Sequence, residues 1–150
     1  MSNTFTQIYL HVVFSVKNRK MMINDKIREH LYMYITGIIT KQNHKLYLIN
    51  GMPDHVHLLF GIRPDSNLSE LIKEIKACSS KYINESGFSN EPFHWQNGFG
   101  AFSVSSSQRE KVYLYIENQE THHENRTFEQ EFLELLKAHG IKHELKYVFD

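Results

Sequence analysis

The chain has 150 residues, of which 41% are hydrophobic and 23% are charged. This length predicts one domain over residues 1–150, and the composition excludes a long disordered chain. Basic and acidic side chains number 17 each, so the net charge of zero argues against a protein that coats nucleic acid through bulk charge. The single cysteine, Cys78, excludes an intrachain disulfide framework and a cysteine-based zinc site.

No apolar run is long enough to span a membrane, so no membrane partner is expected. The first four residues lack the basic and apolar segments of a secretory signal. Both observations favour a reduced cytoplasmic compartment.

The first predicted element is a strand over residues 5–16, where apolar side chains recur at every second position. Asn24 or Asp25 can cap a helix that runs to about Asn43.

Two short strands follow at residues 45–50 and 55–62. Residues 51–54 between them have turn composition, which predicts a hairpin. Ser66 or Asn67 can start a second helix, whose apolar residues fall on one face.

The aromatic and glycine-rich residues 93–104 predict a further strand. Ser105 can start a third helix that runs to about His123, and Thr127 can cap a fourth helix that Gly140 ends. The order β-α-β-β-α-β is that of the ferredoxin-like, split βαβ fold. We therefore predict an α+β chain: an antiparallel sheet with helices on one face, a free second face, and two more helices at the C-terminus.

Two histidines stand out in the predicted strand 55–62. His55 and His57 lie two residues apart, so they point to the same face, with Cα atoms roughly 6.6 Å apart at about 3.3 Å per residue. Two imidazoles at that spacing can converge on one metal ion. Taken alone, the pattern is explained better by a solvent-exposed strand face.

The third predicted helix carries a second polar group. With Tyr115 as the reference, Gln119, His122 and His123 fall within about 80° of it around the helix. This face presents a phenol, an amide and two imidazoles where an amphipathic helix presents an apolar stripe. A surface helix with incidental polar residues is the competing interpretation. Tyr113 points about 200° from Tyr115 and is expected to be a packing residue.

Together, the two patterns predict a metal and tyrosine site for phosphoryl transfer. Two imidazoles and one amide oxygen make a partial coordination shell that leaves positions open for phosphate oxygens. A tyrosine one turn from the amide would lie beside that phosphate. Its free pKa of about 10 makes it a weak nucleophile, which a nearby cation or a general base would activate.

Three segments resemble those of single-tyrosine HUH transposases, the TnpA enzymes of IS200-like insertion sequences. Residues 52–59 (MPDHVHLL) are similar to their histidine–hydrophobic–histidine motif. Residues 112–123 (VYLYIENQETHH) are similar to their tyrosine helix, and residues 95–104 (WQNGFGAFSV) to a third shared block. The opening strand with residues 13–19 also fits, so the resemblance extends over nearly the whole chain.

The resemblance implies a transposase of the prokaryotic cytoplasm that cleaves and rejoins single-stranded DNA through a 5′-phosphotyrosine intermediate. By their places in the motifs, His55, His57 and Gln119 would ligate a divalent ion, Mg²⁺ or Mn²⁺. Tyr115 would be the nucleophile. The resemblance also implies DNA with hairpins near the element's ends, and a homodimer in which one subunit's tyrosine helix can complete the other's histidine site.

Other contacts are less specific. Basic residues that can contact DNA phosphates are Lys17, Arg19, Lys20, Lys73, Lys76 and Lys81, although each taken singly is a typical solvated side chain. His122 and His123 can assist as acid, base or DNA contact. His11 lies opposite the apolar face of the first strand and is expected to be a hydrogen-bonded strand histidine.

Three alternatives stay open. A domesticated transposase acting on chromosomal repeats would share the chemistry and differ in its DNA partner. A non-catalytic module that binds single-stranded nucleic acid would need aromatic and basic residues on the free sheet face. A metal-dependent hydrolase that uses water would form no covalent adduct and would survive the loss of Tyr115.

Overall fold

The computed structural model describes residues 3–150; Met1 and Ser2, part of the segment in which no secretory signal is expected, lie outside the described residues. Its centre is a four-stranded antiparallel sheet in the order β2-β3-β1-β4. The strands are β1 (Tyr9–Ser15), β2 (Lys45–Met52), β3 (His55–Gly61) and β4 (Gly100–Val104). Helix α1 (Asp25–Lys41) joins β1 to β2, and α2 (Leu68–Glu85) joins β3 to β4. This arrangement confirms the predicted α+β, ferredoxin-like class.

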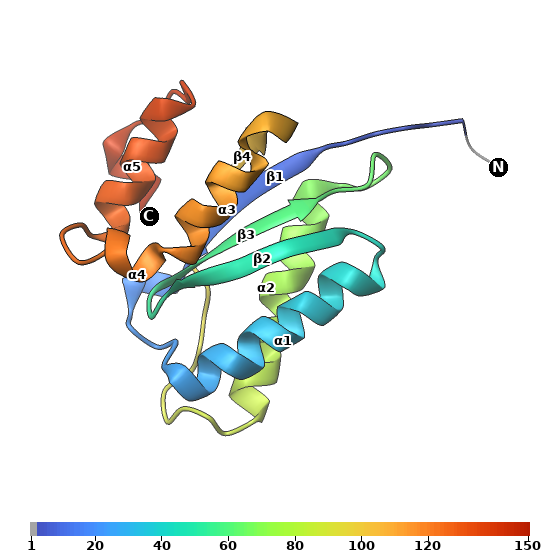
Figure 1. Cartoon of the computed structure of the whole chain (residues 1–150). Helices are drawn as coiled ribbons and strands as arrows, with labels where there is room; N and C mark the ends of the chain where they lie inside the picture. Colours follow the sequence, from blue (N-terminus) through green and yellow to red (C-terminus); the bar gives the residue numbers. More distant parts are fainter. Residues whose placement is uncertain (1–2) are drawn as a thin grey trace.

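Helices α1 and α2 cover one face of the sheet (Figure 1). Each begins at an asparagine that accepts a backbone N–H three residues on, Asn24 from Ile27 and Asn67 from Glu70. The alternating apolar residues of the central strands point into this layer, and they include Val12, Phe14, Val56, Leu58 and Phe60. The remaining side chains of β1 and β3, including both histidines of β3, therefore point to the second face.

The hairpin of β2 and β3 forms as predicted but has a tighter turn. Strand β2 continues to Met52, so Pro53 and Asp54 alone make the turn. A Cβ atom at position 51 would collide with the carbonyl oxygen of His55, so glycine permits the close approach of the two strands. Met52 pairs with His55, and this register sets where the histidines of β3 lie.

Two predicted elements are shorter than expected. Within residues 93–104 only β4 is a continuous strand, while Trp95 forms a single bridge with Val16. The third predicted helix is not continuous: α3 (Arg109–Glu117) and α4 (Gln119–His122) are separated at Asn118, whose φ of −95° and ψ of 26° depart from helical values. Short 3-10 turns, η1 (Lys17–Arg19) and η2 (Ser106–Gln108), follow β1 and precede α3.

The C-terminal helices occupy the second face of the sheet, which the sequence led us to expect as free (Figure 1). Helix α5 (Phe128–Ala138) begins at the predicted cap, Thr127, in a reciprocal capping box with Gln130. Helix α6 (Leu145–Val148) lies near the chain end. Phe128 and Leu136 of α5 pack with Val13 and Phe102 of the sheet, which closes the chain's own helices over the histidines. Within residues 3–150, no helix combines the length and apolar character that a bilayer crossing requires.

Candidate active site

The two histidines of β3 are buried beneath the C-terminal helices, and each ring is held at its Nδ1 atom. His55 Nδ1 lies 2.7 Å from Asp54 Oδ1, and His57 Nδ1 lies 2.7 Å from His11 Nε2. His11 is thus hydrogen-bonded, as expected for a strand histidine. With both Nδ1 atoms engaged, the two Nε2 atoms are left to share another partner, as in histidines oriented for metal binding.

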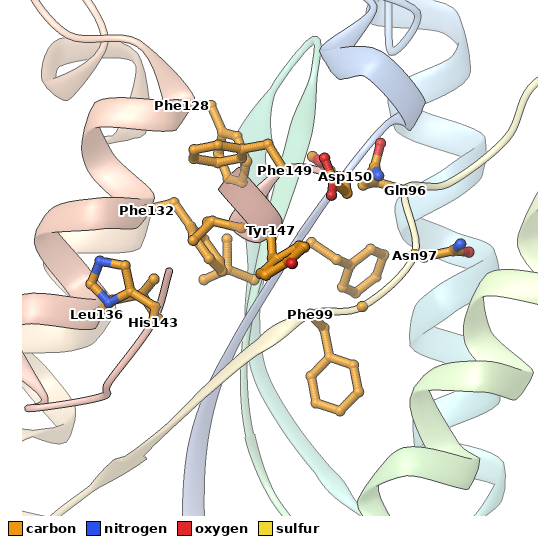
Figure 2. Close-up of a pocket in the computed structure, with 15 residues that line it drawn as sticks. Gln96, Asn97, Phe99, Phe128, Phe132, Leu136, His143, Tyr147, Phe149 and Asp150 are labelled. Atoms are coloured by element: carbon orange, nitrogen blue, oxygen red, sulfur yellow. The ribbon is translucent and has the colours of Figure 1, made fainter. Parts of the chain in front are cut away.

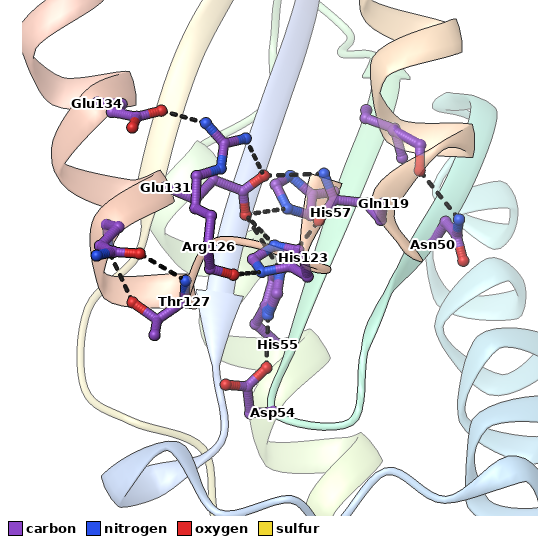
Figure 3. A network of polar contacts seen from close by, with 12 residues as sticks. Asn50, Asp54, His55, His57, Gln119, His123, Arg126, Thr127, Glu131 and Glu134 are labelled. Atoms are coloured by element: carbon purple, nitrogen blue, oxygen red, sulfur yellow. Dashed lines mark hydrogen bonds and ion pairs between the residues drawn. The ribbon is translucent and has the colours of Figure 1, made fainter. Parts of the chain in front are cut away.

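That shared partner is Glu131 of α5 (Figure 3), and this residue has no exposed surface. Its Oε1 atom lies 3.2 Å from His55 Nε2, 3.1 Å from His57 Nε2 and 2.9 Å from His123 Nε2. Its Oε2 atom accepts a hydrogen bond of 2.9 Å from Gln119 Nε2. One carboxylate therefore faces the histidines with one oxygen and the tyrosine helix with the other.

Helix α3 brings Tyr115, and helix α4 brings Gln119, to this carboxylate. Tyr115 Oη donates a short hydrogen bond to Glu131 Oε2, and Gln119 Oε1 lies 3.1 Å from His55 Nε2. Asn50 of β2 fixes where α3 ends, because its side chain donates to the carbonyl oxygens of the last two residues of that helix. The structure thus brings together, within one chain, the tyrosine, the amide and both histidines that the sequence singled out.

Of the neighbouring residues of α3 and α4, some contact the site and others pack around it. The ring of His122 stacks on Tyr115 at 4.5 Å between centroids, while His123 bonds Glu131. Tyr113 lies with the partly buried residues around Leu59, so it packs as predicted.

Glu131 and His55 carry opposite charges at neutral pH. Burial would raise the pKa of Glu131, but hydrogen bonds from His123, His55 and His57 hold that pKa well below its ordinary value. Burial opposes the charged form of His55, yet its hydrogen bonds with Asp54 and Glu131 outweigh burial and raise its pKa to about 9. The site therefore contains a buried ion pair.

The pKa values of the other groups are governed by burial. It lowers the pKa of His57 to about 4, although Glu131 acts in the opposite direction, and lowers that of His11 well below its ordinary value. Burial and the adjacent charge of Glu131 raise the pKa of Tyr115, while Arg126 opposes the rise. The phenol is therefore protonated in this environment, and additional positive charge is needed to favour the phenolate.

The donor set fits a divalent cation. His55, His57 and Glu131 each offer one ligand atom, and these atoms lie within 4.8 Å of one another. Gln119 Oε1 adds a neutral oxygen beside them. Imidazole nitrogens combined with carboxylate and amide oxygens suit divalent ions such as Mn²⁺ or Mg²⁺. The four side chains are fully buried, so they would keep solvent away from the side of the ion that they contact.

Two of the hollows in the structure share Phe128 as a wall residue. A cleft of about 430 Å³ opens beside His123 and Arg126, with Arg19 and Asp54 also on its wall. A second pocket, of about 290 Å³, lies between α5, the chain end and the loop before β4 (Figure 2). Its walls are mainly aromatic and include Phe99, Phe128, Phe132, Tyr147 and Phe149.

Of the six basic residues predicted to contact DNA, Arg19 alone lines the cleft beside the site. Arg19 pairs with Glu129 and donates to the carbonyl oxygen of Phe149, and Lys20 pairs with Glu91. Lys76 donates to backbone carbonyls in the loop before β4, and burial lowers its pKa to about 8. Exposed positions are occupied by Lys17, Lys73 and Lys81. Because α2 carries Lys73, Lys76 and Lys81, these three lie across the sheet from the tyrosine.

Glu131 and Arg126 are two residues at the site that the sequence-based prediction omits. A signal for Glu131 exists: it lies one helical turn from both Phe128 and Leu135, which places a carboxylate at the border of the apolar stripe of α5. No comparable signal marks Arg126, which lies in the turn before α5. Its position at Tyr115 depends on how α5 docks.

The sheet, the paired histidines and the overlying tyrosine helix define the architecture of a small DNA transposase. A family model described as "Transposase IS200 like" matches residues 4–119, and the chain belongs to this family. The match ends at Gln119, so Arg126 and Glu131 lie beyond it.

Individual relatives agree with this assignment. ISDra2 transposase TnpA of Deinococcus radiodurans is 23% identical over 120 residues, covering 75% of this chain and 84% of that protein. A crystal structure of a Deinococcus radiodurans protein described as a transposase is similar in fold, with a TM-score of 0.65 and 24% identity over 79% of this chain and 95% of that one. The structure of a REP-associated tyrosine transposase bound to a REP hairpin has a TM-score of 0.61 and 16% identity, covering 83% of this chain and 75% of that one.

Proposed function

We propose that this transposase family member cleaves and rejoins single-stranded DNA through a 5′-phosphotyrosine intermediate on Tyr115. The observation that carries the proposal is that Tyr115 Oη and the Nε2 atoms of His55 and His57 share one buried carboxylate, that of Glu131. A nucleophile and a cation site thus adjoin each other, as metal-assisted phosphoryl transfer requires. The chain acts as one catalytic domain over residues 1–150.

The cation in this proposal is Mg²⁺ or Mn²⁺. His55, His57 and Glu131 Oε1 would hold it, with Gln119 Oε1 as a fourth ligand. When bound, such an ion supplies positive charge that polarises a phosphate and favours the phenolate of Tyr115. Asp54 and His11 would orient the two histidines through their Nδ1 atoms.

The protein's own groups complete the cleavage step. Tyr115 Oη attacks the phosphorus of the scissile diester, so the Oη–P bond forms and the P–O3′ bond breaks. The phenolic proton leaves to solvent, while the carboxylate of Glu131, which accepts a hydrogen bond from this hydroxyl, stays ionised. The 3′ oxygen takes up a proton from solvent and becomes a free 3′-OH. Attack by a 3′-OH on the phosphotyrosine reverses these steps, so rejoining needs no ATP.

The DNA partner and the assembly follow from the same proposal. One relative is described as bound to a REP hairpin, and we infer that this chain also binds single-stranded DNA with hairpins near the cleavage site. A homodimer would supply the two tyrosines that an exchange between two ends requires. The contact of Tyr115 with the histidine site of its own chain supports a site that is completed within one subunit. The same chemistry would serve a mobile-element enzyme or a domesticated one.

A covalent trapping assay tests the proposal. The wild-type protein is incubated with Mn²⁺ and single-stranded oligonucleotides from its genomic flanks, and an adduct that resists SDS is sought. Tyr115→Phe and excess chelator should each abolish the adduct, while Tyr113→Phe, the matched control on the same helix, should retain it. Cleavage without an adduct would indicate a hydrolase. Tight, metal-independent binding without cleavage would indicate a binding module.

A further inference from the structure

Arg126 contacts the reacting oxygen of the proposed function directly. Its Nη2 atom donates a hydrogen bond of 2.9 Å to Tyr115 Oη and lies 3.5 Å from Glu131 Oε2. The other end of the guanidinium, Nη1, pairs with Glu134 on α5. Tyr115 Oη is therefore placed between an anionic acceptor and a cationic donor.

The position of Arg126 is built into the turn between α4 and α5 (Figure 3). The carbonyl oxygen of Arg126 is bound by His123 Nδ1 at 2.8 Å. The next residue, Thr127, is held by the capping box that begins α5. These contacts hold the backbone on both sides of Arg126. The Arg126 side chain is itself only 23% exposed.

We infer that Arg126 is a further catalytic residue, which stabilises the negative charge on Tyr115 Oη and binds a non-bridging oxygen of the scissile phosphate. The inference rests on the proposed function. Negative charge developing on Tyr115 Oη is opposed by the neighbouring Glu131, and the Arg126 guanidinium offsets that repulsion at hydrogen-bond distance. A guanidinium presents a planar fork of donors that matches a phosphate, so it can serve both oxygens at once.

The approach to Arg126 is open. The cleft of about 430 Å³ beside the site is lined by Arg126, His123 and Arg19 together with the carboxylates of Asp54 and Glu129. A phosphodiester entering this cleft would meet the Arg126 guanidinium, which contacts the hydroxyl of Tyr115. In the transfer step the Oη–P bond forms, the P–O3′ bond breaks and the phenolic proton leaves to solvent, while Arg126 keeps its proton throughout.

The alternative role for Arg126 is a structural ion pair with Glu134. The two roles are separated by measuring the single-turnover rate of adduct formation at saturating DNA and Mn²⁺, together with DNA affinity and thermal unfolding. Arg126→Ala should lower the rate about 10²–10³-fold, the loss typical of one donor to developing charge. Arg126→Lys should lie between Ala and wild type, because it keeps the charge but lacks the fork. Glu134→Gln removes the surface pair and should leave the rate close to wild type.

Chemical rescue adds a readout that a purely structural role would not move. Millimolar guanidinium should restore part of the rate of Arg126→Ala, and an alkylammonium ion should restore less. If Arg126→Ala fails to fold, Arg126→Lys carries the test alone. A wild-type rate in the folded variants would overturn the inference and leave the proposed function intact, since the wild type would still form its adduct. A wild type without any adduct would overturn both.

Discussion

Glu131→Gln is the substitution that probes the buried cluster most severely. The carboxylate meets three histidine nitrogens through Oε1, and the tyrosine hydroxyl and the Gln119 amide through Oε2. Glutamine has the same shape but carries no charge. Its NH₂ group would face either the three histidine nitrogens or the donors of Tyr115 and Gln119. Removing one partner of a buried charged network costs about 3–5 kcal/mol, because the other partner remains buried and uncompensated.

The expected loss is therefore about 3–5 kcal/mol in the free energy of unfolding of the metal-free protein. At about 2–4 °C per kcal/mol for a chain of this size, the melting temperature should fall by about 6–20 °C. Equilibrium urea unfolding in the presence of chelator measures the loss. Glu134→Gln, one turn along α5 and largely exposed, is the control and should change stability by less than about 1 kcal/mol. A loss below about 1 kcal/mol for Glu131→Gln would refute the reasoning, since removing the charge of a buried carboxylate with these partners should lower the free energy of unfolding by more than that.

Three further predictions concern stability. The pKa of His55 is about 9 in the folded protein and about 6.5 in the unfolded chain. In chelator, protonated His55 should therefore stabilise the fold fully below about pH 6.5, and this contribution should be lost as the pH rises to about 9. Urea titrations at several pH values measure this dependence, which Asp54→Asn should weaken. Lys76→Met should cost about 1–3 kcal/mol of unfolding free energy, because two backbone carbonyls lose a charged donor, and should leave the salt dependence of DNA binding unchanged. Gly100→Ala should cost about 1–3 kcal/mol by the same measurement, because the new Cβ would lie 2.8 Å from Phe132 of α5; an unchanged midpoint would contradict this packing.

The fold was predictable because its signals are local. Period-two alternation in β1 and the asparagine caps of α1 and α2 specify these elements without reference to the rest of the chain. The end of α3 was not predictable, because it depends on a tertiary contact: Asn50 of a distant strand binds the last carbonyls of the helix. The covered second face was missed for the same reason, since the docking of α5 depends on side chains of the sheet.

The candidate site, like the fold, could be predicted from the sequence only in part. His55 and His57 lie within one strand, and Tyr115 and Gln119 are only four residues apart across the break between α3 and α4, so their spacing alone was enough to bring each pair together. Glu131 joins the two pairs only through the packing of α5, and sequence spacing carries no information about that contact.

The central claim is that Tyr115 forms the covalent bond to DNA beside the histidine site. The most direct test is to digest the trapped adduct and to locate the modified residue by mass spectrometry. The account predicts a nucleotide joined through a 5′ phosphate to Tyr115, formed only with a divalent ion and single-stranded DNA. An adduct on Tyr113 or on another residue, or an adduct that forms equally well in Tyr115→Phe, would contradict it.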